Sequence, residues 1–168
     1  MKKIVLFIAC GLLIGNMAFA QATKFGYIDS RELLKAMPEL AAADKELQEF
    51  AKTYQDELQK MSKEYEKKVQ EFQAGEKTMS DAVKEVKIKE IQDLQNRMET
   101  YNQSATEKVD TKKQALYDPI LKKADQAIKD VAKEKGYDYV FDASSGALLH
   151  ANESDNILQL VKTKLGIK

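Results

Sequence analysis

The chain has 168 residues, of which 43% are hydrophobic, 32% charged and only 8% aromatic, with seven glycines, two prolines and no tryptophan. So little glycine and proline argues against an all-β sandwich, and so much charge is typical of long helices rather than of an enzyme with a large buried active site. The 27 basic and 27 acidic residues balance, so the chain lacks the basic excess that nucleic-acid binding proteins use, and we expect no nucleic-acid partner.

The first 20 residues have the pattern of a signal peptide. Two lysines precede an apolar stretch, residues 4–15, that is too short to span a bilayer comfortably, and residues 18–20 form a small-x-small cleavage site. We therefore expect residues 1–20 to be removed after Ala20 and the product to be exported to the periplasm. Two alternatives stay open, an uncleaved membrane anchor and lipidation at Cys10.

Residues that carry chemistry are scarce in this sequence. Cys10 is the only cysteine, so the cleaved chain has no thiol for a disulfide, a nucleophile or a metal ligand. His150 is the only histidine, and we interpret it as a strand residue without a catalytic role. No phosphate-binding loop, dinucleotide fingerprint or nucleophile elbow occurs. The sequence predicts no enzyme, no cofactor, no metal site and no stable membrane insertion.

The first element after the signal peptide is a short strand followed by a short helix. Residues 24–29 are rich in β-forming side chains, and Asp29 with Glu32 three residues later forms a capping pattern. We expect a strand here and a helix that ends near Met37.

Residues 39–118 are predicted to form a long antiparallel helical hairpin, because apolar residues recur at steps of three and four in two narrow stripes. The first arm carries Leu40, Leu47, Phe50, Tyr54, Leu58, Met61, Tyr65, Val69 and Phe72. The second arm carries Val83, Val86, Ile91, Leu94, Met98, Tyr101, Ala105, Val109 and Leu116.

The two stripes mirror each other about a turn at residues 74–81. This segment combines Gly75, which can end a helix, with a start signal at Thr78 and Asp81. Position numbers of opposed residues add up to nearly the same value from Phe72 and Val83 at the apex down to the base, which places Met61 opposite Leu94 and Tyr54 opposite Tyr101. Since two helices bury only one stripe each, we expect the distal half to be flexible.

Pro119 is predicted to kink or break the returning arm near Asp118, because proline removes a helical hydrogen bond. After it, residues 137–142 alternate large aromatic side chains with other residues, residues 144–146 form a turn, and residues 147–151 complete a β-hairpin. Residues 152–155 provide a cap for a final amphipathic helix at residues 157–165.

The fold class is therefore α+β and mainly α: a helical hairpin (39–118) on a small β body (21–38 and 119–168). Three strands and two short helices make a small core, and they leave sheet edges and aromatic faces exposed. Joining strands between subunits would cover them, so we predict a homo-oligomer whose interface includes Phe25, Tyr27, Tyr139, Val140, Phe141 and Leu148.

Three blocks of the sequence resemble the Skp/OmpH family of periplasmic chaperones: residues 25–39 (FGYIDSRELLKAMPE), 132–142 (AKEKGYDYVFD) and 155–161 (DNILQLV). The resemblance implies a homotrimer in which strands of three subunits form a β-barrel and three helical tentacles enclose a cavity. It implies that unfolded outer-membrane proteins are held there without ATP. The best-known members are strongly basic, whereas this chain without its first 20 residues has two more acidic than basic residues, which speaks against contact with acidic lipids or lipopolysaccharide.

Side chains that repack against varied partners are candidates for holding such clients. We assign them to Phe50, Tyr54, Met61, Tyr65, Phe72, Met79 and Met98. The alternative is that these residues only form the seam of the hairpin. A second function class also stays open, a coiled-coil scaffold of the cell envelope that binds one folded partner.

Overall fold

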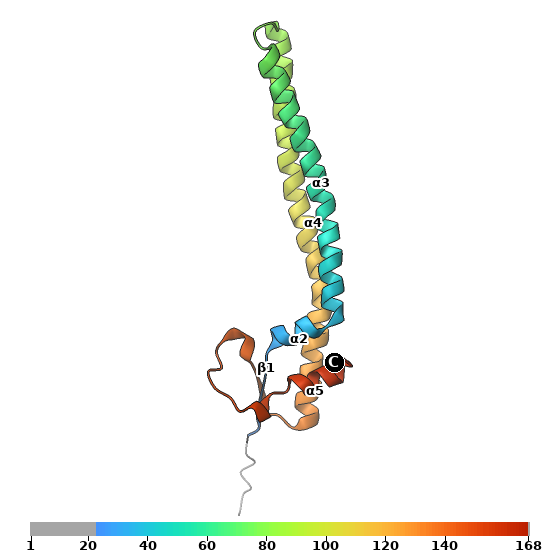
Figure 1. Ribbon diagram of the computed structural model, residues 1–168, viewed down its shortest axis with the longest axis vertical. Helices are drawn as coiled ribbons and strands as arrows, with labels where there is room; N and C mark the ends of the chain where they lie inside the picture. The colour runs from blue at the N-terminus through green and yellow to red at the C-terminus, as the bar shows by residue number, and fades with distance from the viewer. Residues whose placement is uncertain (1–22, 168) are drawn as a thin grey trace, which may run out of the picture.

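A computed structural model describes residues 23–167, and the predicted signal peptide lies outside this range. A long helical hairpin stands on a small body (Figure 1). The hairpin consists of α3, Pro38–Gly75, and α4, Asp81–Lys135, so the prediction of two antiparallel arms is confirmed. The 38 residues of α3 extend roughly 57 Å at the helical rise of 1.5 Å per residue.

The body begins with β1, Phe25–Ile28, and α2, Ser30–Ala36. Asp29 caps α2 as predicted, because its carboxylate accepts hydrogen bonds from the backbone N–H groups of Arg31 and Glu32. The backbone turns again at Met37, and Pro38 begins α3 at a position where a helix needs no N–H donor.

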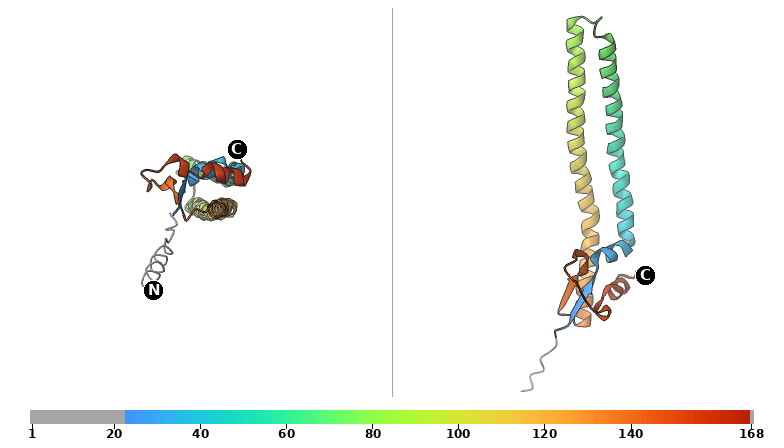
Figure 2. Two further views of the ribbon diagram at one scale, coloured as in Figure 1. Left: turned by 90° about the horizontal axis from the view of Figure 1, so that it is seen from below. Right: turned by 60° about the vertical axis from the view of Figure 1, so that its left-hand side comes forward.

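Strand β2, Tyr139–Asp142, pairs with β1 in parallel, with Phe25 opposite Tyr139 and Tyr27 opposite Phe141. Parallel strands need a long crossover connection, and here α2, α3 and α4 together provide it. The right-hand view of Figure 2 shows both strands beside the lower end of α4. The small sheet therefore closes the base of the hairpin.

The predicted β-hairpin after Gly136 is wrong. Residues 143–145 form a short 3-10 helix, η1 (Ala143–Ser145), which Gly146 ends with a φ of 74°, and residues 147–151 form no strand. The free edge of β1 is taken instead by the chain after a second 3-10 helix, η2 (Glu153–Asp155), where the N–H of Ile157 donates to the carbonyl of Tyr27 over 2.9 Å.

The final helix, α5, spans Leu158–Leu165, as predicted. Its predicted cap differs, because the side chain of Asn156 accepts a hydrogen bond from the N–H of Leu158 over 3.0 Å, whereas residues 153–155 form η2. Helix α5 contributes two fully buried side chains, Ile157 just before its first turn and Val161 within it.

One apolar cluster holds the body together where α2, α5, β1 and the lower ends of α3 and α4 meet. Burial of such aliphatic side chains is the main favourable term in folding a unit of this size. Its buried members are Ile28, Leu33, Met37, Ala43, Ile120, Ala124, Ala127, Val131, Ile157 and Val161.

Of the predicted kink or break at Pro119, the break is wrong, because α4 continues through Pro119 to Lys135. Pro119 is exposed, and so is Ala115, whose carbonyl would have accepted the missing hydrogen bond. Water can satisfy that carbonyl, while the buried neighbour Ile120 anchors the helix in the body. The missing hydrogen bond at Pro119 therefore costs little stability, because solvent can replace it.

The turn between the arms also differs in detail. Ser80, rather than Thr78, is the residue before α4, and the Thr78 hydroxyl donates back to the Gly75 carbonyl over 2.9 Å. The Met79 side chain lies against Gly75, where a Cβ atom would approach Met79 Cε to 2.5 Å. A larger residue at position 75 would therefore only push aside the flexible end of Met79, so close packing alone does not require glycine at the apex.

Candidate interaction surfaces

The outer face of the sheet is aromatic. Alternation along β1 and β2 puts Phe25, Tyr27, Tyr139 and Phe141 on one face, and the exposed fractions of Phe25, Tyr139 and Phe141 are 50%, 58% and 47%. The Phe25 ring stacks on Tyr139 and Phe141, with centroids 5.6 Å and 6.1 Å apart. Such a contiguous apolar patch on a small body is typical of a protein interface.

The extended segment 147–152 borders this aromatic face. Leu148, His150, Ala151 and Asn152 line a groove of about 410 Å³ together with residues of β1 and with Phe141. Leu149 beside them is 96% exposed. Of the predicted interface residues, Leu148 lies in this groove, whereas Val140 points to the opposite face and packs against the body's own core.

The predicted client-binding residues on the hairpin lie along its seam. Met61 and Leu94, which were predicted to oppose each other, are both buried in the hairpin, with 7% and 3% of their surface exposed. Tyr54 contacts Tyr101 with ring centroids 6.0 Å apart, which confirms the mirrored register at this pair. Phe50, Tyr65, Phe72, Met79 and Met98 are half-buried. The hairpin therefore uses part of each of these side chains for its own packing.

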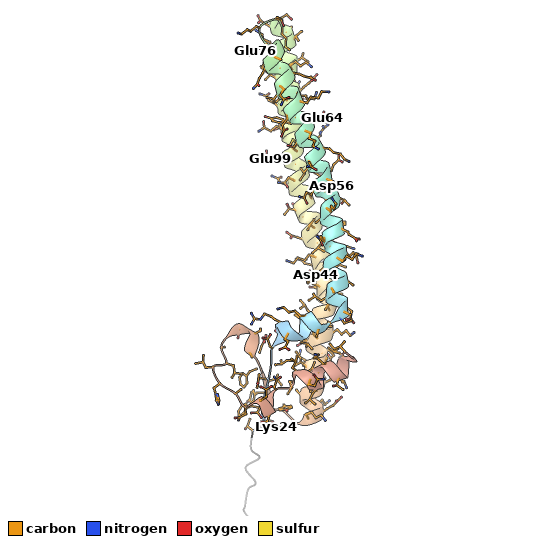
Figure 3. All side chains as sticks on the ribbon, in the orientation of Figure 1. Lys24, Asp44, Asp56, Glu64, Glu76 and Glu99 are labelled. Carbon is orange, nitrogen blue, oxygen red and sulfur yellow. The ribbon has the colours of Figure 1, made fainter. Side chains whose placement is uncertain are left out.

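Charged pairs connect the two arms from base to tip. Glu39 pairs with Lys123 at the base, Glu46 with Lys112 at 2.6 Å, and Lys68 with Glu90 at 3.0 Å. The hydrogen bond from Lys68 lowers the pKa of the Glu90 carboxyl. Elsewhere, side chains project into solvent along the whole hairpin, from Asp44 near the base to Glu76 at the apex (Figure 3). Exposed pairs of this kind align the arms but stabilise them little.

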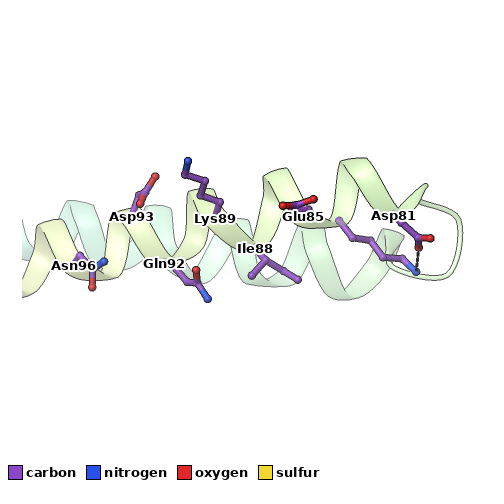
Figure 4. A pocket seen from close by; sticks show the side chains of 8 residues that line it. Asp81, Glu85, Ile88, Lys89, Gln92, Asp93 and Asn96 are labelled. Atoms are coloured by element: carbon purple, nitrogen blue, oxygen red, sulfur yellow. Dashed lines mark ion pairs between the residues drawn. The ribbon is translucent and has the colours of Figure 1, made fainter.

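The outer face of α4 near the apex is polar. Figure 4 shows Ile88, which is 43% exposed, surrounded by Glu85, Lys89 and Gln92, while Asp81 pairs with Lys84 at 4.0 Å. A lone aliphatic side chain among charged neighbours is ordinary on a solvated helix face. Val83 and Val86, expected in the seam, are 44% and 57% exposed, so the predicted seam does not hold at these two positions.

Asp142 fastens the end of β2 to the start of α2. Its carboxylate accepts hydrogen bonds from the Ser30 hydroxyl over 2.7 Å, from the Ser30 N–H over 3.2 Å and from the Ser144 N–H over 2.9 Å. Desolvation raises the pKa of Asp142, but these hydrogen bonds outweigh it and lower the pKa from 3.8 to about 2.

Because the pKa of Asp142 is lower in the folded chain, its ionised form stabilises the fold above pH 3.8, and this contribution disappears as the pH falls toward 2. Asp142→Asn is expected to lower the free energy of unfolding at pH 7 by about 1 kcal/mol, given partial solvent screening. Urea titrations from pH 7 to pH 2 should show the difference from the unchanged protein shrinking below pH 4. A difference that is constant over this range would contradict the role of the ionised carboxylate.

Within residues 23–167 no cluster of three or more His, Cys, Asp or Glu side chains is arranged to hold a metal ion. No helix in the same range is both long and apolar enough to cross a membrane. The prominent features of the described chain are thus two surfaces, the aromatic sheet face and the flanks of the hairpin.

Comparison with known proteins agrees with this architecture. Residues 24–165 match the family model described as outer membrane protein, OmpH-like. The chain belongs to the OmpH-like family. The match spans both strands, the complete hairpin and α5, so the resemblance predicted from three sequence blocks is confirmed.

Relatives of this OmpH-like chain are named as chaperones. It is 29% identical over 160 residues to the chaperone protein Skp of Yersinia enterocolitica, covering 94% of each chain. It is 28% identical over 167 residues to Skp of Photorhabdus luminescens, covering 96% of this chain and 100% of that one. The chain superposes with a TM-score of 0.72 on a crystal structure of an OmpH-like outer membrane chaperone from Caulobacter crescentus CB15, at 16% identity, covering 85% and 83% of the two chains. That similarity confirms the fold.

Two features of the hairpin were missed in the sequence. Tyr101 was recognised as a seam residue but not as part of an aromatic cluster with Phe50 and Tyr54. Lys108 and Lys112, whose ammonium groups lie 5.8 Å and 5.9 Å from the Tyr54 and Phe50 ring centroids, were not singled out. Their spacing of seven and eleven residues from Tyr101 places all three on one side of α4, and this spacing was the available signal.

Proposed function

We propose that this protein is an ATP-independent periplasmic holdase, a chaperone that binds unfolded outer-membrane proteins and prevents their aggregation. The observation that supports this most directly is a long solvated hairpin on a body whose sheet exposes an aromatic face, in a chain of the OmpH-like family. The relatives named Skp are described as chaperone proteins. The proposal includes no catalytic residues.

The aromatic face supports a homotrimer. If three copies join through Phe25, Tyr27, Tyr139 and Phe141, three hairpins stand side by side and a cavity lies between them. Segment 147–152, with Leu148 in the groove and Leu149 fully exposed, is the part of the chain best placed to extend this contact. A single two-stranded sheet is marginally stable in water, so pairing between copies also stabilises the body.

The positions of the apolar contacts indicate which part of the chain assembles and which part contacts clients. Residues 21–38 and 119–168 form the assembly body, and residues 39–118 form the tentacle that contacts clients. In support, Ile120, Ala124 and Val131 of lower α4 pack in the body cluster. Holding needs no ATP in this scheme, because binding the unfolded chain lowers its free concentration by mass action. The nearly balanced charge gives no support to lipopolysaccharide binding, which is not part of the proposal.

The proposal predicts that the mature protein keeps an outer-membrane β-barrel protein soluble when that protein is diluted from urea without nucleotide. Light scattering should stay near the baseline once there is one trimer for each client, and the mass of the complex should equal three chains and one client. A folded β-barrel protein in detergent is the control and should not bind. Aggregation as fast as in buffer would contradict the holdase and favour an envelope scaffold that binds one folded partner.

A further inference from the structure

We infer that the hairpin contacts its client along one flank, in a groove between α3 and α4 with an aromatic floor. Three rings form this floor: Phe50 meets Tyr54 edge-on with centroids 5.2 Å apart, and Tyr54 meets Tyr101 at 6.0 Å. This inference rests on the proposed holdase function and names where on the tentacle the client binds.

The groove extends beyond the rings on the same flank. Toward the base, a hollow of about 420 Å³ is lined by Phe50 of α3 and by five residues of α4, Glu107, Lys108, Thr111, Lys112 and Ala115. Toward the apex, a hollow of about 380 Å³ is lined by Met61, Arg97 and Tyr101, among others. From Phe50 to Met61, α3 rises roughly 17 Å, which is the length of about five residues of extended polypeptide.

The three rings keep exposed surface that a ligand can contact. All three are half-buried, so each shows part of its surface to solvent. Lys108 and Lys112 cover Tyr54 and Phe50 at 5.8 Å and 5.9 Å, near the outer limit for a cation–π contact. Their flexible stems can move aside, which lets an apolar side chain take their place on the ring.

The charged side chains on this flank indicate which charge a ligand of the groove should carry. Lys112 pairs with Glu46, Lys60 with Glu57, and Arg97 with Glu64. Between residues 23 and 167 neither Lys108 nor the adjacent Glu107 makes an ion pair, but Lys108 is the one that lies over the Tyr54 ring, so its ammonium group is available to a carboxylate of a ligand on the rings. The groove therefore fits an extended segment of unfolded chain in which an aromatic or aliphatic side chain stands beside an acidic residue.

The size of the groove argues against a folded partner or a second copy. A stable protein interface buries about 800 Å² on each side, with a central apolar core. Three half-buried rings flanked by charged pairs offer much less, but several weak contacts of this kind suit a mobile unfolded chain. On the opposite side of α4 the described chain has one ring, Tyr117, which lies near the base and bonds to Asp44, so the stretch around Thr106 gives the test an internal control.

Thr111 and Thr106 are a matched pair for this test. Both are exposed on α4, and each hydroxyl donates to the carbonyl four residues earlier, Thr111 to Glu107 over 2.8 Å and Thr106 to Asn102 over 3.0 Å. Thr111 lines the groove, whereas Thr106 lies about 140° away around the helix. A photoreactive phenylalanine analogue is placed at one position or the other in the full mature chain.

With a urea-unfolded outer-membrane β-barrel protein as the probe, irradiation is expected to crosslink the client about five times more efficiently from position 111 than from position 106. Equal yields from both positions would overturn the inference. Crosslinking of position 111 to a second copy, or to added anionic lipid vesicles in preference to the client, would overturn it as well. If the unchanged protein fails to keep the client soluble, the proposed function fails first, and the two failures are thereby distinguished.

Charge reversal gives a second readout. Lys108→Glu is expected to weaken client binding roughly fivefold at low salt, with the difference fading at 0.5 M salt as the charges are screened. Lys113→Glu, an exposed lysine on the other side of α4, is the control and should leave binding unchanged. Equal effects of the two variants would show that only net charge matters and would overturn the site. Helical content by circular dichroism verifies that both variants fold.

Discussion

If the protein assembles as the proposed homotrimer, replacing Phe141 by aspartate is expected to convert it into single chains. Phe141 is 47% exposed in one chain and stacks on Phe25, whose ring centroid is 6.1 Å away. If copies join through this face, the new carboxylate is buried against aromatic rings without a partner, which costs several kcal/mol per copy. Light scattering should show the mass falling from three chains to one.

The same variant should keep its helical content, because the apolar cluster of the body lies on the other face of the sheet, under Ile28 and Val140. Leu160→Asp is the matched control, since Leu160 is a 37% exposed apolar residue on α5, away from the aromatic face. Its mass should not change. An unchanged mass for Phe141→Asp would contradict assembly through this face. If Phe141→Asp loses client binding and Leu160→Asp keeps it, client binding depends on assembly.

Local patterns in the sequence predicted the hairpin well. Stripes at steps of three and four depend only on the helical period, and the mirrored order of Tyr54 and Tyr101 follows once a turn separates them. The Asp29 cap was predictable for the same reason, since the donor and acceptor groups lie within three residues.

Pairings between distant segments could not be predicted in this way. Strand β2 aligns with β1 across more than a hundred residues, and no local signal distinguishes that parallel pairing from a β-hairpin with residues 147–151. The bonds of Asp142 to Ser30 and Ser144 also join residues far apart in the sequence, and they lie where the chain enters η1 rather than a third strand. Pro119 was misjudged since its effect depends on which side of α4 it occupies, and that side faces solvent.

The candidate site was only partly predictable. The stripe identified Phe50, Tyr54 and Met61, but periodicity alone does not say how much of each ring stays exposed beside the seam. The contribution of Lys108 depends on its position over Tyr54, which follows from the register of both helices together. Polar residues on helix flanks carry weak sequence signals, so a groove formed partly by lysine stems is found only in the structure.

Leu94→Ala is expected to loosen the distal hairpin without unfolding the body. Leu94 is 3% exposed and, with Met61 and Ala105, belongs to the few buried side chains between the arms above the body. Removing its side chain should cost about 2–4 kcal/mol, because two helices without further cover cannot close the cavity with other residues. Backbone amides of residues 61–94 should then exchange with solvent roughly a hundredfold faster, as measured by hydrogen exchange and mass spectrometry.

The body is expected to keep its protection in that variant, since its ten clustered residues, Val161 and Leu33 among them, make no use of the distal seam. Gln95→Ala, at the exposed neighbouring position on α4, is the control and should leave exchange unchanged or slightly slower, because alanine favours a helix. Faster exchange throughout the chain, α5 included, would mean that tentacle and body unfold as one unit. Confinement to the hairpin would mean that the hairpin opens independently of the body, which is the flexibility that the proposed holdase would use on clients of different size.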